Sequence, residues 1–164
     1  VRTDNGSKVT DSFDDKMYLV YKVNGKWIIK EWLCTNQPGQ ASLLKPVSGG
    51  TAIMVPGQYS GSYKIDYHNG KYKALCQRLD KVNVWRDGNK DAKYDIGGKI
   101  YSGSFGINIH KAGKDSIKVG LNSAGCTVFK READFNEFMK IITISADKYG
   151  NKFTYTLFDE KDFK

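Results

Sequence analysis

Residues 107–126 read INIHKAGKDSIKVGLNSAGC, and this stretch contains the two side chains that decide how the chain is interpreted. His110 ends an apolar run typical of a strand, and Cys126 follows after fifteen intervening residues. An imidazole within hydrogen-bond reach of a thiol is the usual means of making a cysteine nucleophilic near neutral pH. Of the two histidines and three cysteines, only this pair combines a short spacing with small residues leading to the sulfur. We therefore expect His110 and Cys126 to lie on neighbouring segments.

The residues around Cys126 favour acyl chemistry. Gly125 lets other backbone approach the sulfur, and N–H groups near Gly125 and Cys126 could point at a developing oxyanion. Asn108 and Ser123 are the polar neighbours that we expect to orient His110. From proximity in the sequence, the cleft is expected to be lined by Tyr101, Ser102, Ser104 and Lys111. The alternative is that Cys126 is a buried small hydrophobe at the start of a strand, a common role for a lone cysteine.

The order of these residues resembles the L,D-transpeptidase family, the YkuD-like cysteine acyltransferases of peptidoglycan. His110 matches the general base of the family, and Cys126 matches its nucleophile. Ser123 and Gly125 match the small residues that lead into that nucleophile. The resemblance covers residues 17–158. It implies a mainly β domain with one C-terminal α-helix and a β-sandwich or barrel-like core, and it requires no cofactor.

The resemblance also implies a reaction. The thiolate of Cys126, formed by proton transfer to His110, would attack an L,D-peptide bond in a peptidoglycan stem peptide and give a thioester acyl-enzyme. An amine acceptor would then yield a cross-link, whereas water would yield hydrolysis. Ala124 stands where the family has a second histidine, and Thr-Val at residues 127–128 replaces a hydrophobic residue followed by Arg or Asn. These departures keep the nucleophile and the base, and the change at Ala124 favours hydrolysis.

Two other function classes stay open. A peptidoglycan peptide hydrolase of bacterial or phage origin would keep the same dyad and exclude an acceptor peptide. A non-catalytic wall-binding or structural module would keep the fold and the basic surface, with an inert Cys126. The resemblance implies a location in the cell envelope, in the periplasm or outside the cell.

The composition is that of one globular domain with a basic surface. The chain has 164 residues, of which 40% are hydrophobic, and a formal net charge of +8. A positive charge favours an anionic partner, but the lysines are scattered and no RNA-binding motif occurs, so we expect no nucleic acid. The expected partners are peptidoglycan stem peptides and anionic cell-wall polymers. No apolar run approaches the ~18 residues of a membrane span, and we expect a monomer.

The chain divides into three expected regions. Residues 1–15 are polar and acidic and are expected to be a flexible lead-in or linker, residues 16–160 a single catalytic domain, and residues 161–164 a charged tail. Because the chain starts without Met and shows no signal-peptide pattern, we expect a mature or trimmed form. Cys34 and Cys76 could form a disulfide in an exported protein, whereas in a cytosol all three cysteines would stay reduced.

Strand signals dominate the first two thirds of the chain. Two Asn-Gly pairs, at residues 24–25 and 69–70, lie between strand-like runs and predict hairpins. His68, beside the second pair, is expected to be a solvated turn residue. Residues 34–50 are expected to form a long loop. Further short strands are predicted at residues 51–55, 82–86, 99–109 and 152–158.

One helix is predicted after Cys126. Apolar residues recur at steps of three and four, which indicates one buried face: Phe135, Phe138, Met139, Ile142, Ala146 and Tyr149. Asp134 followed by Glu137 predicts a capping-box start, and Gly150 predicts the end of the helix. We expect this face to be core packing that holds the strand of the nucleophile in place.

A second candidate site lies in residues 87–95. Its side-chain oxygens occupy the front positions of a calcium-binding loop and come from Asp87, Asn89, Asp91 and Asp95. Ala92 replaces the usual glycine of such a loop, and Gly98 stands where a bidentate glutamate would be. The alternatives are a weak or structural calcium site and a polar turn between strands.

Overall fold

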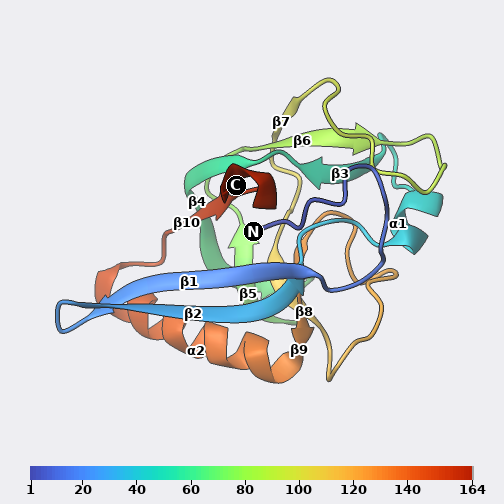
Figure 1. Cartoon of the computed structure of the whole chain (residues 1–164). Coiled ribbons are helices and arrows are strands. Elements are labelled where there is room, and N and C mark those ends of the chain that lie inside the picture. The colour runs from blue at the N-terminus through green and yellow to red at the C-terminus, as the bar shows by residue number, and fades with distance from the viewer. Residues whose placement is uncertain (164) are drawn as a thin grey trace.

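A seven-stranded mixed sheet curls into a half-barrel in the computed structural model, and a small three-stranded sheet lies beside it (Figure 1). The structure describes residues 1–163. The strands are β1 (Asp15–Val23), β2 (Lys26–Thr35), β3 (Thr51–Met54), β4 (Gly57–His68), β5 (Tyr72–Gln77), β6 (Val82–Asp87), β7 (Tyr101–Gly103), β8 (Ile109–Gly113), β9 (Thr127–Arg131) and β10 (Phe153–Leu157). The helices are α1 (Gln40–Leu44), α2 (Glu132–Tyr149) and the 3-10 helix η1 (Glu160–Phe163). The prediction of a mainly β fold with one substantial C-terminal helix is confirmed.

The strand order explains how distant parts of the chain meet. The large sheet runs β1-β2-β9-β8-β5-β4-β10, and the small sheet runs β3-β6-β7. Neighbouring strands are antiparallel except for β8 and β9, which are parallel. A parallel pair needs a long connection, which residues 114–126 provide. The residues that follow this connection therefore lie beside the strand that precedes it.

Both predicted hairpins are present. Asn24 and Gly25 have φ values of 49° and 79°, and they join β1 to β2. Asn69 and Gly70 have φ values of 51° and 69°, and they join β4 to β5. Asparagine and glycine tolerate these left-handed conformations, which is why the sequence signal is reliable. The expectation for His68 is wrong, because it is the last residue of β4 and pairs with Tyr72.

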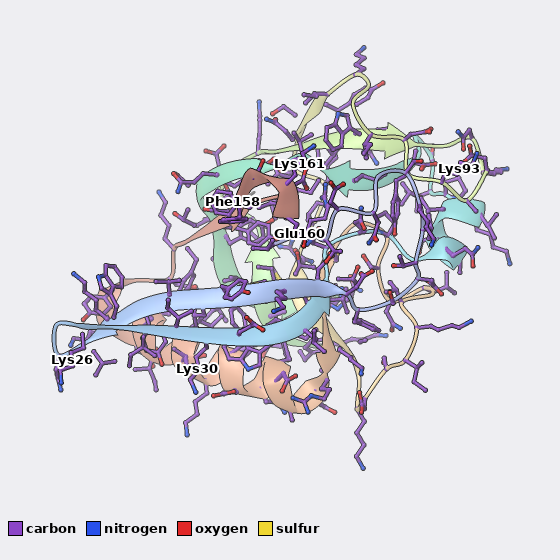
Figure 2. All side chains as sticks on the ribbon, in the orientation of Figure 1. Lys26, Lys30, Lys93, Phe158, Glu160 and Lys161 are labelled. Carbon is purple, nitrogen blue, oxygen red and sulfur yellow. The ribbon has the colours of Figure 1, made fainter. Side chains whose placement is uncertain are left out.

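Helix α2 packs along the β1–β2 hairpin and the start of β9 (Figure 1). The ring of Phe138 lies 6.0 Å from Trp32 and 5.1 Å from Phe129. On the rim of this contact, Lys30 forms a 2.9 Å ion pair with Glu137, and Figure 2 shows Lys30 projecting from the hairpin on the helix side. Because α2 directly follows β9, this packing anchors the strand that begins after Cys126.

The predicted helix differs from the observed one at its start. It begins at Glu132, and its N-cap residue Arg131 makes no side-chain cap hydrogen bond. Asp134 lies inside the first turn, where its carboxylate accepts two 2.8 Å hydrogen bonds from Arg131. The predicted capping box is therefore wrong, whereas Gly150, with φ 98°, ends the helix as expected. The apolar face is shorter than predicted, since Tyr149 is 76% exposed.

The first fifteen residues pack against the domain, so the expected flexible lead-in is wrong. The guanidinium of Arg2 is buried and donates to Asn36 Oδ1 at 2.8 Å and to the Met54 carbonyl at 2.7 Å. Asp15 is also buried, and its carboxylate accepts the N–H groups of Thr3 and Asn36. These bonds fasten the N-terminal segment to both sheets.

The other boundaries differ less from expectation. The predicted long loop at residues 34–50 includes the short helix α1, whose Leu43 is fully buried in a small cluster with Ile53 and Tyr94. Of the predicted charged tail, residues 161–163 belong to η1, and Lys164 lies outside the described residues. Within residues 1–163, no helix combines the length and the apolar character needed to cross a membrane.

Gly39 gives a test of how closely the segment before Cys126 packs. A Cβ at Gly39 would overlap the carbonyl oxygen of Gly120, and the Gly39 N–H donates to the Ser123 carbonyl at 3.0 Å. We expect Gly39→Ala to lower the free energy of unfolding by about 1–3 kcal/mol, the usual cost of overpacking. Gly98→Ala is the matched control, because a Cβ there meets no atom within 4 Å. Equal urea midpoints for the two variants would contradict this packing.

Candidate active site

The parallel pair β8–β9 brings His110 and Cys126 to the same side of the sheet. In the register, Ile109 lies opposite Thr127 and His110 lies opposite Val128. The Thr127 N–H donates to the Asn108 carbonyl at 2.9 Å, so the ladder continues to the residue after Cys126. Register neighbours point their side chains to the same side, and alternate residues along a strand do so too. His110 therefore shares a side with Val128 and with Cys126, two residues earlier.

The thiol of Cys126 is half-buried between two backbone segments. Its Sγ accepts a 3.4 Å hydrogen bond from the Asn108 N–H and donates to the Gly106 carbonyl at 3.6 Å. Burial raises the pKa of Cys126 to about 11, and the Asn108 N–H offsets only part of this rise. The resting thiol is therefore protonated at neutral pH.

His110 is buried and has a defined tautomer. Its Nδ1 lies 2.8 Å from the carbonyl oxygen of Lys111. A carbonyl can only accept, so Nδ1 carries the proton and Nε2 carries the free lone pair of a base. Burial, with a smaller contribution from His68, lowers the pKa of His110 to about 4, and the hydrogen bond to Lys111 offsets part of this fall. At neutral pH the imidazole is therefore neutral and the thiol protonated, so the two side chains do not form an ion pair.

Ser123 and Gly125 shape the turn that presents the thiol. The buried hydroxyl of Ser123 donates to the Cys126 carbonyl at 2.8 Å and accepts the Gly125 N–H at 3.2 Å. Gly125 has φ 120°, and a Cβ there would overlap the carbonyl oxygen of Ala52 on β3. Ser123 thus holds the turn and does not orient His110 as expected. The Gly125 N–H is already bonded, whereas the Cys126 N–H has no partner within residues 1–163.

His68 and Asn108, which the sequence did not place in the pair of His110 and Cys126, contact that pair in the structure. The ring of His68 stacks on the ring of His110, with centroids 4.1 Å apart and an angle of 20° between the planes. Asn108, expected to orient His110, instead holds His68 through a 3.0 Å contact between its amide nitrogen and His68 Nδ1. His68 is the last residue of β4, and the three-residue connection Asn69–Lys71 follows it.

Gln77 is a further residue that sequence reasoning missed. Its buried side chain accepts the N–H groups of Phe105, Gly106 and Ile107, at 3.0, 3.0 and 3.3 Å. Its amide nitrogen donates to the Gly103 carbonyl at 2.9 Å. Gln77 thereby fixes the segment whose Gly106 carbonyl meets Cys126 Sγ. Nothing in the local sequence distinguishes this glutamine.

The residues expected to line one cleft are separated. Lys111 pairs with Glu132, lies 5.0 Å above the ring of Tyr72, and borders a cavity of about 500 Å³ beside α2. Tyr101 lies on the small sheet and borders a different cavity, together with Trp85 and Arg86. Ser102 pairs with Asn83 in the β6–β7 ladder, and Ser104 is exposed after β7.

The polar side chains of the candidate calcium loop form hydrogen bonds with other groups of the same loop. Asn89 donates to Asp95 at 3.0 Å and accepts the Asp91 N–H at 3.0 Å, while Asp87 accepts the Asp95 N–H at 3.2 Å. In the described residues, no three His, Cys, Asp or Glu side chains gather closely enough to hold a metal ion. Asp87 is buried with one carboxylate oxygen unbonded, and burial raises its pKa. Calcium binding stays a prediction that this arrangement does not favour.

The three cysteines are free. Cys34 and Cys76 are both buried, and Cys126 is the most accessible of the three. The disulfide that the sequence left open between Cys34 and Cys76 is not formed in this structure.

The buried imidazole predicts a specific loss of stability in acid. Unfolding restores the ordinary pKa of His110, 6.5, whereas the folded value is about 4. Between these values the unfolded chain binds more protons, so stability falls as the pH is lowered from 6.5 to 4, by on the order of 3 kcal/mol. His110→Gln should lose this dependence, as measured by urea unfolding across that pH range.

Comparing the two proteins removes the contribution of other groups. Burial raises the pKa of Asp15 to about 6, so its contribution runs the opposite way: it is present at low pH and is lost as the pH rises through 6. Asp15 is common to both proteins and cancels in the difference. Identical pH slopes for the native chain and His110→Gln would contradict a buried neutral His110.

Comparisons of the chain with protein-family models, with curated proteins and with solved structures gave no match. The functional interpretation therefore rests on the residues of the site and on their geometry.

Proposed function

We propose that this chain is a cysteine-dependent acyltransferase of the L,D-transpeptidase type that acts on peptidoglycan stem peptides, with Cys126 as nucleophile and His110 as general base. The observation that carries the proposal is the β8–β9 register, which sets the thiol and a neutral imidazole with a free Nε2 on one side of the same strand pair. The resemblance of the INIH and SAGC segments to the family supplies the substrate class.

The proposed reaction begins with a carbonyl bound at Cys126. As the S–C bond forms, the thiol proton moves to Nε2 of His110, and the carbonyl oxygen becomes an oxyanion near the unpartnered Cys126 N–H. Collapse of this intermediate breaks the C–N bond, and His110 returns the proton to the departing amine. A second nucleophile then attacks the thioester and gives its proton to His110, which passes it to the released thiol.

The protonation states suit general-base catalysis. With the thiol pKa raised to about 11 and the imidazole pKa lowered to about 4, an ion pair is unfavourable in the empty site. The proton would move only when the forming S–C bond makes the sulfur more acidic. We therefore expect thiol alkylation without substrate to accelerate only well above pH 8.

Hydrolysis is the second candidate outcome, and Ala124 favours it. This residue is exposed on the turn before the nucleophile, and its methyl group offers an acceptor amine no hydrogen bond. Water needs no such binding group to reach the thioester. Both outcomes use the same acyl-enzyme.

The positive surface supports an anionic polymer as the wider target. The net charge is +8, and Figure 2 shows labelled lysines on separate parts of the surface, from the hairpin tip at Lys26 to Lys93 and Lys161. A dispersed charge attracts a long polyanion without selecting a sequence.

Removal of the nucleophile or the base tests the mechanism. Cys126→Ala and Cys126→Ser should keep the fold and lose all turnover of stem peptides, because no thioester can form. His110→Ala should lower the rate by a factor of about 10² to 10⁴. Cys76→Ala, which removes a buried thiol from the core, is the control expected to stay active. Full activity of either Cys126 variant would contradict the acyl-enzyme mechanism.

The distribution of products tests the role of Ala124. Incubation with stem peptides and an amine acceptor should release mainly free acid, counted by mass spectrometry. Ala124→His should raise the share of cross-linked product, because an exposed imidazole at this position can bind the acceptor. A native enzyme that yields mainly cross-links would refute the preference for hydrolysis.

A further inference from the structure

The rings of the two histidines of the chain stack on each other. His110 is only 6% exposed, and the ring of His68 lies against it with nearly parallel planes, 4.1 Å apart. On its own strand pair, His68 also contacts Tyr72, whose ring centroid lies 5.6 Å away. The geometry points to His68 as a positioning residue for His110: its ring covers one face of the base and fixes the plane in which Nε2 lies.

Asn108 links this stack to the nucleophile. Its Oδ1 accepts the Gln77 N–H at 3.0 Å, so its amide nitrogen must face His68. An amide nitrogen only donates, and His68 Nδ1 is therefore an acceptor with the ring proton on Nε2. The backbone N–H of the same Asn108 donates to Cys126 Sγ. One residue thus orients the second imidazole and contacts the thiol.

The charged groups around His68 keep it neutral. Burial, Arg78 and Lys71 all lower its pKa, and within the stack the only other titratable ring is His110. Arg78 is held in place by hydrogen bonds to the carbonyls of Gln77 and Tyr67 and by an ion pair with Asp66. Two stacked imidazolium rings would repel each other, whereas a neutral aromatic face attracts a cation. A neutral His68 therefore lets His110 accept the proton of Cys126.

Imidazole nitrogen NMR on the intact chain tests this inference without any substrate. The spectrum contains two rings only, since the chain has two histidines. We expect His110 in the Nδ1–H form with a low pKa. In His68→Ala the ring should keep the Nδ1–H tautomer that the Lys111 carbonyl selects, but it becomes more exposed to water, so its pKa should rise by about one unit or more. His68→Phe should retain the native tautomer and titration, because it restores the stacked ring.

Asn69→Gly is the matched control. Asn69 lies beside His68, and glycine accepts its positive φ of 51°. This variant should leave the His110 signals unchanged. An unchanged His110 titration in His68→Ala would overturn the positioning role, and so would a His68→Phe protein that behaves like His68→Ala.

The effect on turnover rests on the proposed function and is measured separately. His68→Ala should lower kcat on stem peptides about 10- to 100-fold with little change in KM, since it misaligns a base without touching the bound peptide. His68→Phe should recover most of kcat. If the native chain does not turn over peptidoglycan while the NMR results hold, the proposed function fails and the positioning role stands. If His68→Ala retains full kcat on an active enzyme, the positioning role fails instead.

Discussion

The parallel hydrogen-bonding of β8 with β9 is the constraint on which the rest of the structure depends. It is the one parallel pair among the described strands. The chain therefore leaves the sheet at the end of β8 and returns, through residues 114–126, to the end of the sheet at which β8 begins. The return places Cys126 beside Asn108 and inserts β9 between β8 and β2. Helix α2 then follows without a loop and covers Phe129. Cys126, His110 and helix α2 are thus positioned by a single pairing of strands.

Buried polar side chains also hold the segments around Cys126 in place. Around the thiol, the backbone between β7 and β8 forms no ladder, and its N–H groups would cost about 1–3 kcal/mol each if buried without partners. The side-chain oxygen Oε1 of Gln77 accepts three of them, and the hydroxyl of Ser123 bonds to the Gly125 N–H in the turn on the other side. Asn108 connects the two regions. The site is therefore held by buried amides and a hydroxyl as much as by apolar packing.

The sequence predicted the features that depend on near neighbours. Asn-Gly turns need only two residues, and the face of α2 repeats within each turn, so the hairpins and the helix were found. His110 and Cys126 were selected from their chemistry, and their catalytic role stays a prediction. Long-range contacts were not: the stacking of His68, the bonds of Gln77 and the burial of Arg2 each join segments that are far apart in the chain. The capping box failed for a related reason, since β9 runs straight into α2 and Arg131, not a cap residue, binds Asp134.

The raised pKa of Cys126 also affects how readily its sulfur is oxidised. Peroxides and other oxidants attack thiolates, and the fraction of thiolate falls tenfold for each unit by which the pKa exceeds the pH. A thiol with a pKa of about 11 is almost entirely protonated at pH 7. An enzyme that works without a reducing environment would gain from this, because its sulfur would become vulnerable only during the brief time in which a substrate draws off the proton. Burial of Cys126 thus makes the resting thiol less reactive and also protects it from oxidation.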